Sequence, residues 1–580
     1  MTGKKMISII LAGAVLTAFS SCGDGKNSSD SAATELSVYE KYAEVPVDYK
    51  KKNAEFEDSS LNLWFDHSFS KIVQSNTVSS DRNTYKMYTA KNEKEDCQFF
   101  LSSREEKTVK LEITDFTDNG GAVVPTFLYY EYYFSMPYGG EEQMVPDAIP
   151  ECGKGQIFTV AANTSTGFII QAQTSVDTPA GDYTATLTIS DSADRKIKIA
   201  DVFLHVWDFI LSENTSCRTA MWIDKNNLQG MDYKTVYDYL LDNRVNAYDL
   251  PYGLSDDNIN TYLDNPRVNS FNVLGFKYNR ESGKTEAQIK TAISAAYKKL
   301  SAKSSWNSKG YFYLVDEPNP SELQKLEWIK MYGEWLSELY PGYRQLSPFY
   351  TDQWYDDEKS EDWIEYLRPY INIWAPKTYA YTTLREYGQI VNGKCLYKEG
   401  QEGEIDSKFG NYPARIRKMT ENDGAEAWWY VTSQPGEPYI TFNTNESGTA
   451  YRVLFWQQKM NGVKGLLYWS VNYWSGDGWN SCENEWTPGS KTYGNGQLIY
   501  PGAKVGKNSP VGSLRLECIR DGIEDYQMLT MLDKYIGADK TKELINRTTT
   551  NVAVWNGSDD NFASERIIAG NYLEALSKAK

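Results

Sequence analysis

Short runs in which apolar and polar residues alternate fill the early part of the chain. They lie between residues 36 and 212 and are separated by Gly, Asp and Asn; examples are TVKLEITDF (108–116), DYTATLTIS (182–190) and KIKIADVFLHVWDF (196–209). Alternation with a period of two gives a strand one apolar and one polar face. The pattern therefore predicts an antiparallel β-sandwich domain over residues 36–212.

After residue 213 the pattern changes to short apolar runs that alternate with helical periodicity. Eight such runs are found, at residues 219–224, 245–250, 269–276, 311–317, 343–350, 371–379, 426–432 and 465–471. Helical patterns lie between several of them, at 233–243, 286–300 and 321–340, the last with Ser321 and Glu322 near its start. Eight strands alternating with helices favour a TIM-type (β/α)8 barrel over residues 213–535, and the alternative is a doubly wound open sheet.

The remaining chain, residues 536–580, is predicted to be a helical extension packed on the barrel. The segment RDGIEDYQMLTMLDKYI (520–536) leads into it, and we expect a helix to begin there because Asp521 and Glu524 have the spacing of a capping box. This structural role is favoured over a catalytic one for both acids. A final amphipathic helix is expected over residues 563–578.

The N-terminus has the features of an export signal. Two lysines precede the apolar run ISIILAGAVLTAF (7–19), which is too short to span a membrane and ends two small residues before Cys22. A cysteine at this place resembles a bacterial lipoprotein signal over residues 1–22, although Phe19 stands where Leu is usual. Residues 23–35 then read as a flexible tether. We expect an exported protein that a lipid on Cys22 holds on a bacterial membrane, facing the periplasm or the cell surface; the alternative is an ordinary cleaved signal peptide.

Composition narrows the classes of partner. The chain has 580 residues, a net charge of −18, 17 Trp and 43 Tyr. The acidity argues against nucleic acid, which needs a basic face, whereas the aromatic residues suit carbohydrate because a flat ring covers the C–H face of a sugar. Only two histidines occur, His67 and His205, and the seven cysteines include no CxxC pair. We therefore expect no metal and no cofactor, and a Ser-His-Asp triad is not indicated.

Two adjacent carboxylates end the fourth apolar run of the predicted barrel. The segment YFYLVDEPNP (311–320) changes abruptly from apolar residues to Asp316 and Glu317, and Pro318 follows directly. Barrel enzymes build their active sites at the carboxyl ends of the strands. Proline disfavours the helical region for the residue before it, so we expect an extended Glu317 on a stiff support. The structural alternative is an acidic strand end that caps the next helix.

Two carboxylates among many aromatic rings, without a histidine or cysteine cluster, favour glycoside hydrolysis. Neighbours on one strand are poorly placed to flank a sugar from opposite sides, as the usual retaining pair must. They suit a substrate-assisted reaction, in which the 2-acetamido oxygen of the sugar attacks its own anomeric carbon. Glu317 would act as general acid and then as base, and Asp316 would orient the acetamido N–H and stabilise the positive charge.

Several segments together resemble one bacterial family. They are VDEP (315–318), GVKGLLYWSVNYW (462–474), GNGQLIYPG (494–502) and SLRLECIRDGIEDYQML (513–529). Their combination is similar to the domain family of unknown function numbered 4091, to which glycoside hydrolase family 123 is related. The resemblance implies an exo-acting, retaining hydrolase of terminal β-linked 2-acetamido sugars, with N-acetylgalactosamine as the implied sugar and Asp316 and Glu317 as the catalytic pair.

The substrate-binding residues are predicted from their places at other strand ends. Tyr379 is expected to hold the acetamido carbonyl oxygen. Only alternate side chains of a strand face inward, so one of Trp428 and Trp429 belongs to the core, and we place Trp429 at the sugar. The remaining candidates for substrate contact are Trp222, Trp374, Lys377, Tyr381, Trp469 and Trp474.

Two other functions stay open at this point. An ordinary retaining glycosidase would pair an acid on the fourth strand with a nucleophile on the seventh, where Glu437 is available. Against it, Asp316 precedes Glu317 where that group of barrel enzymes usually has Asn. A non-catalytic, lipid-anchored glycan-binding protein would also explain the aromatic residues and the signal. In each case the partner is a glycan or glycoconjugate and the membrane is reached only through the lipid; the sequence leaves the oligomeric state, the linkage and the sugar epimer open.

Overall fold

The computed structural model describes residues 37–45, 58–77, 80–349, 355–356, 361–381, 412–433, 436–474, 476–485 and 489–579. The chain divides into two compact units, Met1–Lys41 and Tyr42–Lys580. In the first unit the described residues form α1 (Val38–Lys41). All elements named below belong to the second unit. The predicted signal, the tether and Cys22 lie outside the described residues.

The early part of the larger unit consists of two β-sheets that share a core. One sheet has the order β1 (Leu61–His67), β3 (Lys94–Ser103), β11 (Thr164–Gln173) and β7 (Thr126–Tyr130). The other has the order β10 (Ile157–Val160), β4 (Lys107–Ile113), β12 (Gly181–Asp191), β13 (Lys196–Ile210) and β2 (Tyr85–Lys91), and β5 (Phe116–Thr117) with β6 (Val123–Val124) pairs beside β12. All of these pairs are antiparallel except β13 with β2, which is parallel.

The alternation in the sequence accounts for this core. In β12 every second residue is buried, and Leu187 of that strand lies in one cluster with Phe99 and Phe168 of the opposite sheet. The rings of Phe99 and Phe168 stack with their centroids 5.0 Å apart. These two sheets and their shared core agree with the predicted sandwich.

Among the described residues, four hairpins lie outside these sheets. The largest, β8 (Tyr132–Tyr138) with β9 (Glu141–Ala148), packs its apolar side on Trp479 and Tyr500. The others are β18 (Tyr355–Asp356) with β19 (Glu361–Asp362), β23 (Glu483–Glu485) with β24 (Lys491–Tyr493), and β25 (Thr549–Asn551) with β26 (Val554–Trp555).

Parallel strands form the sheet of the later part. Five of them have the order β14 (Arg218–Met221), β22 (Gly465–Tyr468), β21 (Glu426–Val431), β20 (Ile373–Pro376) and β17 (Leu346–Phe349), and β15 (Phe271–Asn272) pairs with β16 (Gly310–Tyr311). Parallel bridges join Met221 to Ala247 and Phe312 to Gln345, and the N–H of Asn272 donates to the carbonyl oxygen of Tyr248. Of the predicted runs, 245–250 contains only a bridge, and each of the others contains a strand.

Alternate residues of these strands belong to two different buried clusters. One, called here the strand-lined cluster, consists of Ala220, Tyr248, Tyr311, Tyr313, Leu346, Ile373, Ala375, Trp428, Tyr430 and Leu467. The other is much larger and combines strand residues such as Trp374 and Trp429 with residues of the surrounding helices. One face of the parallel strands therefore packs on helices, and the other supplies the strand-lined cluster.

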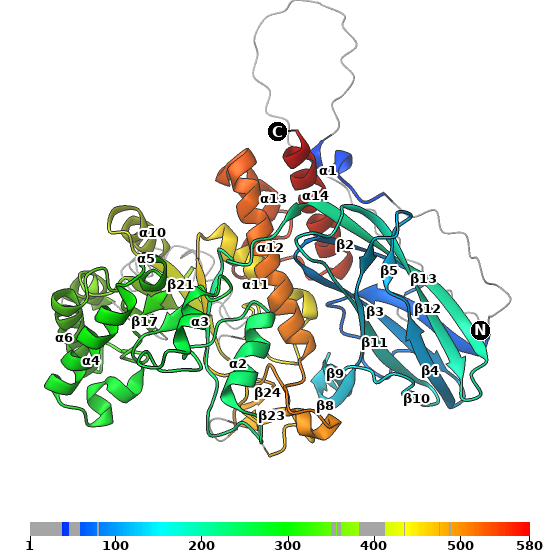
Figure 1. Ribbon diagram of the computed structural model, residues 1–580, viewed down its shortest axis with the longest axis horizontal. Coiled ribbons are helices and arrows are strands. Elements are labelled where there is room, and N and C mark those ends of the chain that lie inside the picture. Colours follow the sequence, from blue (N-terminus) through cyan, green and yellow to red (C-terminus); the bar gives the residue numbers. More distant parts are fainter. Residues whose placement is uncertain are drawn as a thin grey trace, which may run out of the picture. The chain divides into compact units, whose positions relative to one another are not determined.

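Helices occupy the stretches between the parallel strands. They are α2 (Tyr233–Asp242), α3 (Ile259–Asp264), α4 (Glu286–Leu300), α5 (Ser304–Asn307), α6 (Leu323–Leu339), α7 (Trp363–Leu367), α10 (Tyr412–Asn422) and α11 (Gly448–Met460), with 3₁₀ turns η2 (Phe276–Tyr278), η3 (Arg280–Ser282) and η4 (Thr378–Tyr381). The predicted helices correspond to α2, α4 and α6, which Figure 1 shows in green. Ser321 is not the cap of α6, because Glu322 occupies that position without a side-chain capping bond.

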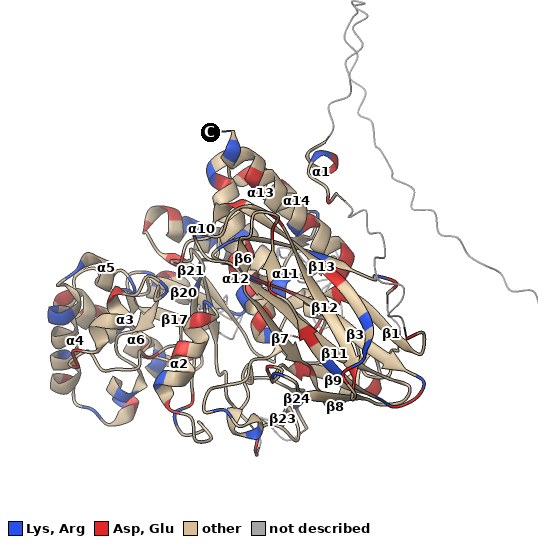
Figure 2. Ribbon diagram, turned by 45° about the vertical axis from the view of Figure 1, so that its right-hand side comes forward, with Lys and Arg blue, Asp and Glu red and all other residues tan. Residues whose placement is uncertain are grey.

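After η6 (Gly502–Val505) the chain ends in α12 (Leu514–Ile536), α13 (Ala538–Ile545) and α14 (Asp559–Lys578). The hydroxyl oxygen of Ser513 accepts a hydrogen bond from the N–H of Leu516 and caps α12. The predicted helix start at residue 520 is therefore wrong, and Asp521 and Glu524 are not a capping box. The helix predicted at 563–578 is present within α14. Figure 2 shows acidic and basic residues interspersed along α2 and α13.

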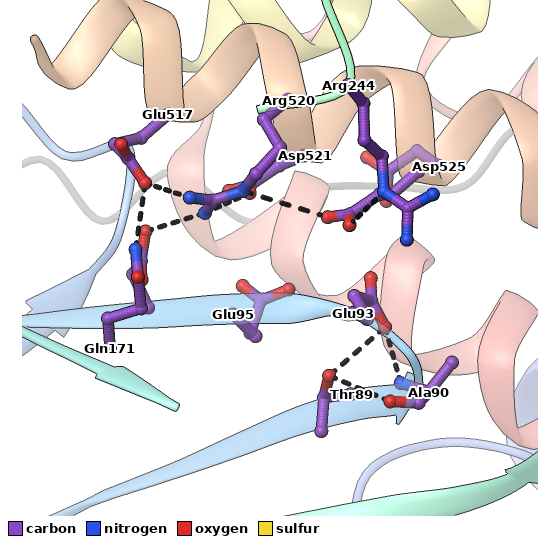
Figure 3. A network of polar contacts seen from close by, with 12 residues as sticks. Thr89, Ala90, Glu93, Glu95, Gln171, Arg244, Glu517, Arg520, Asp521 and Asp525 are labelled. Atoms are coloured by element: carbon purple, nitrogen blue, oxygen red, sulfur yellow. Dashed lines mark hydrogen bonds and ion pairs between the residues drawn. The ribbon is translucent and has the colours of Figure 1, made fainter. Parts of the chain in front are cut away.

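Helix α12 lies between the sandwich and the parallel strands in both ribbon views (Figures 1 and 2). It carries part of a buried ionic network, called here the junction cluster, which Figure 3 shows in part. Its members are Glu93, Glu95, Asp96, Arg244, Arg452, Glu517, Arg520, Asp521, Glu524, Asp525 and Arg566. The guanidinium of Arg520 lies 2.9 Å from Asp96 on β3 and 2.6 Å from Asp521 on α12, so it joins the two parts.

The described residues contain five cysteines, and all five are free thiols: Cys97, Cys152, Cys217, Cys482 and Cys518. Cys395 lies outside the described residues. In the ranges that the structure describes, no helix is both long enough and apolar enough to cross a bilayer.

Candidate active site

Asp316 and Glu317, called here the carboxylate pair, follow β16 at the end of a buried stretch. Residues 311–315 are all buried, whereas Asp316 is exposed to solvent and Glu317 is half-buried. The chain reaches the surface at these two positions, as the abrupt change in the sequence predicts. An ionised carboxylate is costly to bury without a partner, which explains why the apolar run stops here.

The backbone at Glu317 differs from the prediction. Its φ is +38°, in the left-handed region, whereas Pro318 led us to expect an extended residue. The left-handed turn has a geometric consequence. In a continuous strand, neighbouring side chains point to opposite faces, so an extended Glu317 would point away from the side that Asp316 faces. Leaving the extended conformation lets both carboxyls meet side chains of the same strand-lined cluster.

Each carboxyl accepts a hydrogen bond from a tyrosine of that cluster. The hydroxyl of Tyr313 donates to Oδ1 of Asp316 at 2.5 Å, and the hydroxyl of Tyr430 on β21 donates to Oε1 of Glu317 at 2.6 Å. Burial raises the pKa of both tyrosines well above the ordinary value, so both remain donors. The two bonds come from different parts of the sheet and hold the two carboxyls separately.

Charges around the pair act unequally. Water reaches Asp316, yet the protein atoms packed around its carboxyl desolvate it in part and raise its pKa above the ordinary value, against the lowering effect of the Tyr313 hydrogen bond. Burial lowers the pKa of Lys377, and attraction to Glu317 opposes that effect. The ammonium of Lys377 lies 5.8 Å from the ring centroid of Tyr430. Lys377 therefore stands beside Glu317, and Lys325 is the cation that acts on Asp316.

Some predicted binding residues do lie near the pair or at exposed strand ends. Lys377 and Tyr379 are half-buried just after β20, and Tyr379 acts electrostatically on the Tyr430 hydroxyl. Trp222 follows β14 and is 38% exposed, so part of its indole is accessible to solvent. Trp469 is half-buried, and its indole N–H donates to Asn495 at 2.9 Å. For these residues, contact with a sugar stays a prediction.

Four predicted contacts point elsewhere. Trp374, Tyr381, Trp429 and Trp474 are each less than a tenth exposed and belong to the cluster that packs on helices. The indole N–H of Trp429 donates to Gln458 on α11, and that of Trp474 donates to the carbonyl oxygen of Ile499. These placements correct the assignment, because rings buried this deeply offer no open face to a sugar. Alternation along β21 turns Trp428 and Tyr430 inward instead.

Sequence reasoning did not predict the contacts that three residues make beside the pair. Tyr313 and Tyr430 are the hydrogen-bond donors described above. Phe276, on η2, is 39% exposed and packs edge-on against Tyr313 with centroids 4.8 Å apart. The signal that could have found the tyrosines is their register. Both lie on inward positions, Tyr313 two residues after Tyr311 and Tyr430 two residues after Trp428.

The alternative nucleophile Glu437 is exposed on the segment after β21. Its charge acts on Glu446, whereas the charged groups that act on Asp316 are Glu317, Lys325 and Glu281. This separation speaks against a direct pairing of Glu437 with the carboxylate pair. Asn472, at the end of the predicted eighth strand, is fully buried and bonds to the backbone of Asp224 and Asn227.

One cavity, of about 620 Å³, is lined by other residues and contains neither member of the pair. Three of the acids that line it already have partners: Asp66 lies 2.8 Å from Arg82, Asp560 lies 2.9 Å from His67, and Asp559 accepts a hydrogen bond from Ser70 at 2.8 Å. The other histidine, His205, bonds to Asp182 on the sandwich. The described residues contain no group of three or more His, Cys, Asp and Glu side chains placed to hold a metal ion.

Comparison with known proteins gives the class of the chain. The family model described as glycoside hydrolase 123, catalytic domain, matches residues 233–532. The chain therefore belongs to glycoside hydrolase family 123. It is a glycoside hydrolase, and its substrate is a glycan. No curated protein matches the sequence.

One solved structure shares the fold of this chain. A family 123 glycoside hydrolase from Clostridium perfringens, described in connection with glycolipid glycan hydrolysis, is 12% identical with a TM-score of 0.62, and the match covers 90% of this chain and 98% of that one. A family 2 glycosyl hydrolase from Bacteroides cellulosilyticus is 10% identical with a TM-score of 0.22, covering 70% of this chain and 46% of that one. An endo-β-1,4-mannanase from Thermotoga petrophila is 12% identical with a TM-score of 0.30, covering 55% and 77%. The last two are too dissimilar to support an argument.

Proposed function

We propose that the protein is an exo-acting hydrolase of terminal β-linked 2-acetamido sugars, with N-acetylgalactosamine as the preferred sugar, and that it works by a retaining, substrate-assisted mechanism. The observation that carries the proposal is the carboxylate pair itself. Two neighbouring acids reach solvent on one side of the sheet, and each has its own hydroxyl donor. The family to which the chain belongs supports the reaction class, and the sequence resemblance supports the sugar.

The fold that we propose for the catalytic part is a (β/α)8 barrel over residues 213–535. Its support is the hydrogen bonding described above. At one edge of the five-stranded sheet, β14 bridges to Ala247, and the neighbouring Tyr248 bonds to β15. At the other edge, Phe312, which follows β16, bridges to Gln345, which precedes β17. In such a barrel the strand-lined cluster fills the interior, and the carboxylate pair stands at the carboxyl ends of the strands, where barrel enzymes place their chemistry. The sandwich would be the preceding domain, residues 36–212, and residues 536–580 the helical extension.

In the first step, the acetamido oxygen attacks the anomeric carbon while the bond from that carbon to the leaving oxygen breaks. The carboxyl proton of Glu317 passes to the leaving oxygen, so the aglycone departs as a neutral alcohol. Positive charge develops on the bicyclic oxazolinium that forms. The ionised carboxylate of Asp316 accepts the acetamido N–H and stabilises this charge.

In the second step, water attacks the anomeric carbon from the side that the aglycone left. The carboxylate of Glu317 takes a proton from that water, and the bond between the anomeric carbon and the acetamido oxygen breaks. The sugar is released with its original β configuration, and Glu317 again carries its proton. Tyr379 is the proposed donor to the acetamido oxygen, and Trp222 is a proposed platform for the apolar face of a sugar ring.

The test is a panel of aryl 2-acetamido-2-deoxy glycosides of both epimers, run beside the corresponding 2-hydroxy sugars. The proposal requires hydrolysis of the 2-acetamido sugars, faster for the galacto epimer, and no comparable hydrolysis of the 2-hydroxy sugars. A thiazoline that mimics the oxazolinium should inhibit. Labelling of Glu437 by a mechanism-based fluoro-sugar would support the ordinary retaining mechanism, and binding of glycans without any turnover would support a binding protein.

We also propose that a lipid on Cys22 anchors the exported protein to a bacterial membrane. The support is the apolar run followed by small residues and a cysteine. Radiolabelled fatty acid should enter the protein in cells, and Cys22→Ala should abolish the label while leaving the mature chain soluble.

A further inference from the structure

The two tyrosines that contact the carboxylate pair are buried. Tyr313 is 4% exposed and Tyr430 is 2% exposed, and both rings belong to the strand-lined cluster. Tyr313 is packed between Tyr248, at 5.7 Å, and Phe276, at 4.8 Å, with both rings in edge contacts. Such packing holds each hydroxyl at a defined place, so the carboxyl that accepts from it is held as well.

The two hydrogen bonds reach one oxygen of each carboxyl. Tyr313 binds Oδ1 of Asp316, and Tyr430 binds Oε1 of Glu317. The other carboxyl oxygen of Glu317 accepts no hydrogen bond from the described residues, and Glu317 is partly open to solvent. A carboxylic acid that must give its proton to an incoming glycosidic oxygen needs this arrangement, with one oxygen fixed and the other presented.

The charged and titratable groups facing the pair come from several elements. On Asp316 act Glu317, Lys325 of α6 and Glu281 of η3, together with the Tyr313 hydroxyl. Facing Glu317 are Asp316, Lys377 after β20, and Tyr248 and Tyr430 of the strand-lined cluster. The two carboxyls therefore differ in their other neighbours. Lys325 lowers the pKa of Asp316 and Glu281 raises it, whereas Lys377 is the charged neighbour of Glu317.

We propose that Tyr313 and Tyr430 are positioning residues, which orient Asp316 and Glu317 for their different roles in the reaction. Tyr313 keeps Asp316 turned toward the acetamido group in its ionised form. Tyr430 holds one oxygen of Glu317 so that the other faces the glycosidic oxygen, and it stabilises Glu317 after the proton has left. This inference rests on the proposed function for its chemistry, while the hydrogen bonds that carry it are independent of any substrate.

The two bonds make opposite predictions for the pH profile of kcat/KM. Both donors favour the ionised carboxylate, so removing either one makes its carboxyl harder to ionise. Asp316 must be ionised to act, so Tyr313→Phe should move the acidic limb to higher pH and narrow the profile. Glu317 must be protonated to act first, so Tyr430→Phe should move the alkaline limb to higher pH and widen it. Each shift should be about one pH unit, as expected for a hydrogen bond to a charged group.

Tyr248→Phe is the matched control. Tyr248 belongs to the same cluster and faces both carboxyls, but among the described residues its hydroxyl donates to neither. Its removal should leave both limbs in place. If either tyrosine variant fails to fold, 3-fluorotyrosine placed at the same position keeps the ring and makes a stronger donor, so the limb should move the opposite way. Limbs that stay in place, or that move together in both variants, would overturn the assignment.

A second measurement separates this inference from the proposed function. Infrared difference spectra follow the carboxyl bands during a pH titration without substrate, and Asp316→Asn and Glu317→Gln identify the two bands. Tyr313→Phe should shift only the Asp316 midpoint, and Tyr430→Phe only the Glu317 midpoint, both upward. Shifts of this kind in a protein that hydrolyses no 2-acetamido sugar would uphold the positioning and reject the function. A protein that hydrolyses 2-acetamido sugars but shows no shift of these bands would uphold the proposed function and reject the positioning role of the tyrosines.

Discussion

Carboxylates gather in two regions of this molecule, and their partners differ. In the junction cluster seven carboxylates meet four guanidinium groups, with side chains almost wholly buried (Figure 3). In the carboxylate pair, Asp316 and Glu317 are open to water and are held by tyrosine hydroxyls. A guanidinium neutralises an acid and binds it in a fixed fork, whereas a hydroxyl orients an acid and leaves its charge unneutralised.

The difference separates structural acids from chemical ones. Buried charges are stable only when they are paired, so removing one partner leaves an uncompensated charge and strongly destabilises the fold. Acids that water reaches, and that no guanidinium neutralises, remain free to exchange a proton with a ligand. In a sequence of 78 acidic residues, the partner and the access to water, more than the residue type, identify the reactive ones.

The largest expected effect is on activity, from Glu317→Gln. Glutamine keeps the size and one oxygen acceptor for Tyr430 but cannot give a proton. Turnover of glycosides with poor leaving groups should fall by about 10²- to 10⁴-fold, as loss of a general acid does. Substrates with activated aryl leaving groups should lose less. The thermal midpoint should stay where it is.

Glu281→Gln is the control for that variant, since it removes an exposed acid that acts on Asp316 without belonging to the pair. Its turnover should change only slightly. Full activity of Glu317→Gln on substrates with poor leaving groups would contradict the assignment of the carboxylate pair to the chemical step.

Arg520→Met tests the other region. The substitution leaves Asp96, Glu517 and Asp521 without their shared partner. We expect a loss of about 3–5 kcal/mol in the free energy of unfolding, measured by denaturant titration, with activity per folded molecule retained. Arg195→Met, which removes an exposed ion pair on the sandwich, should cost less than about 1 kcal/mol. Equal stability of the two variants would show that the junction cluster is not structural.

Asp316→Asn should have a smaller effect than Glu317→Gln and a more selective one. Asparagine no longer supplies a negative charge to the developing oxazolinium, so turnover of 2-acetamido sugars should fall by about 10²- to 10³-fold. Binding of the product sugar, followed by calorimetry, should change little. Equal losses of turnover and product binding would mark Asp316 as a structural residue.

The smallest expected effect is the pH dependence of stability, to which buried acids of the junction cluster contribute. Burial raises the pKa of Asp96 to about 7 and that of Glu524 to about 8, from ordinary values of 3.8 and 4.5, and raises the pKa of Glu95 well above its ordinary value. The folded chain then binds more protons than the unfolded chain at intermediate pH. The stabilising contribution is complete below the unfolded values and is lost as pH rises through about 7 and 8.

Denaturant titrations at pH 6 and pH 9 measure this slope. The free energy of unfolding should be lower at pH 9, and the double variant Asp96→Asn with Glu524→Gln should flatten the difference. Glu317→Gln should leave the slope unchanged. A slope that stays unchanged in the double variant would show that neither Asp96 nor Glu524 contributes to it.

Much of the architecture was readable from periodicity. Alternation predicted the sandwich because strands such as β12 have one wet and one dry face, and seven of the eight apolar runs after residue 213 contain a strand. The carboxylate pair was readable because an apolar run cannot continue through two acids. The inward face of β21 was not readable. A period of two says that Trp428 and Trp429 face opposite sides, and only pairing with β20 and β22 tells which side is which.

Two other errors have the same origin. Asp521 and Glu524 have the spacing of a capping box, but their partners include Arg244, Arg452 and Arg520, and Arg244 lies 280 positions away from Glu524 in the chain. At Glu317 the local preference imposed by Pro318 was overridden, and its carboxyl binds Tyr430, 113 positions away. Local rules weigh a few tenths to a few kcal/mol, and tertiary bonds of similar size decide against them.

The order of residues alone determined where this chain alternates, where its apolar runs end, and that two acids stand together at one such end. Those are properties of neighbouring positions in the chain, and they do not depend on how the remaining residues fold. Folding in three dimensions decided which hydroxyl meets which carboxyl, which tryptophans lie beneath helices, and which acids are neutralised by arginine. The physical reason is that burial and hydrogen bonding depend on residues distant in the chain, whose approach no local pattern records.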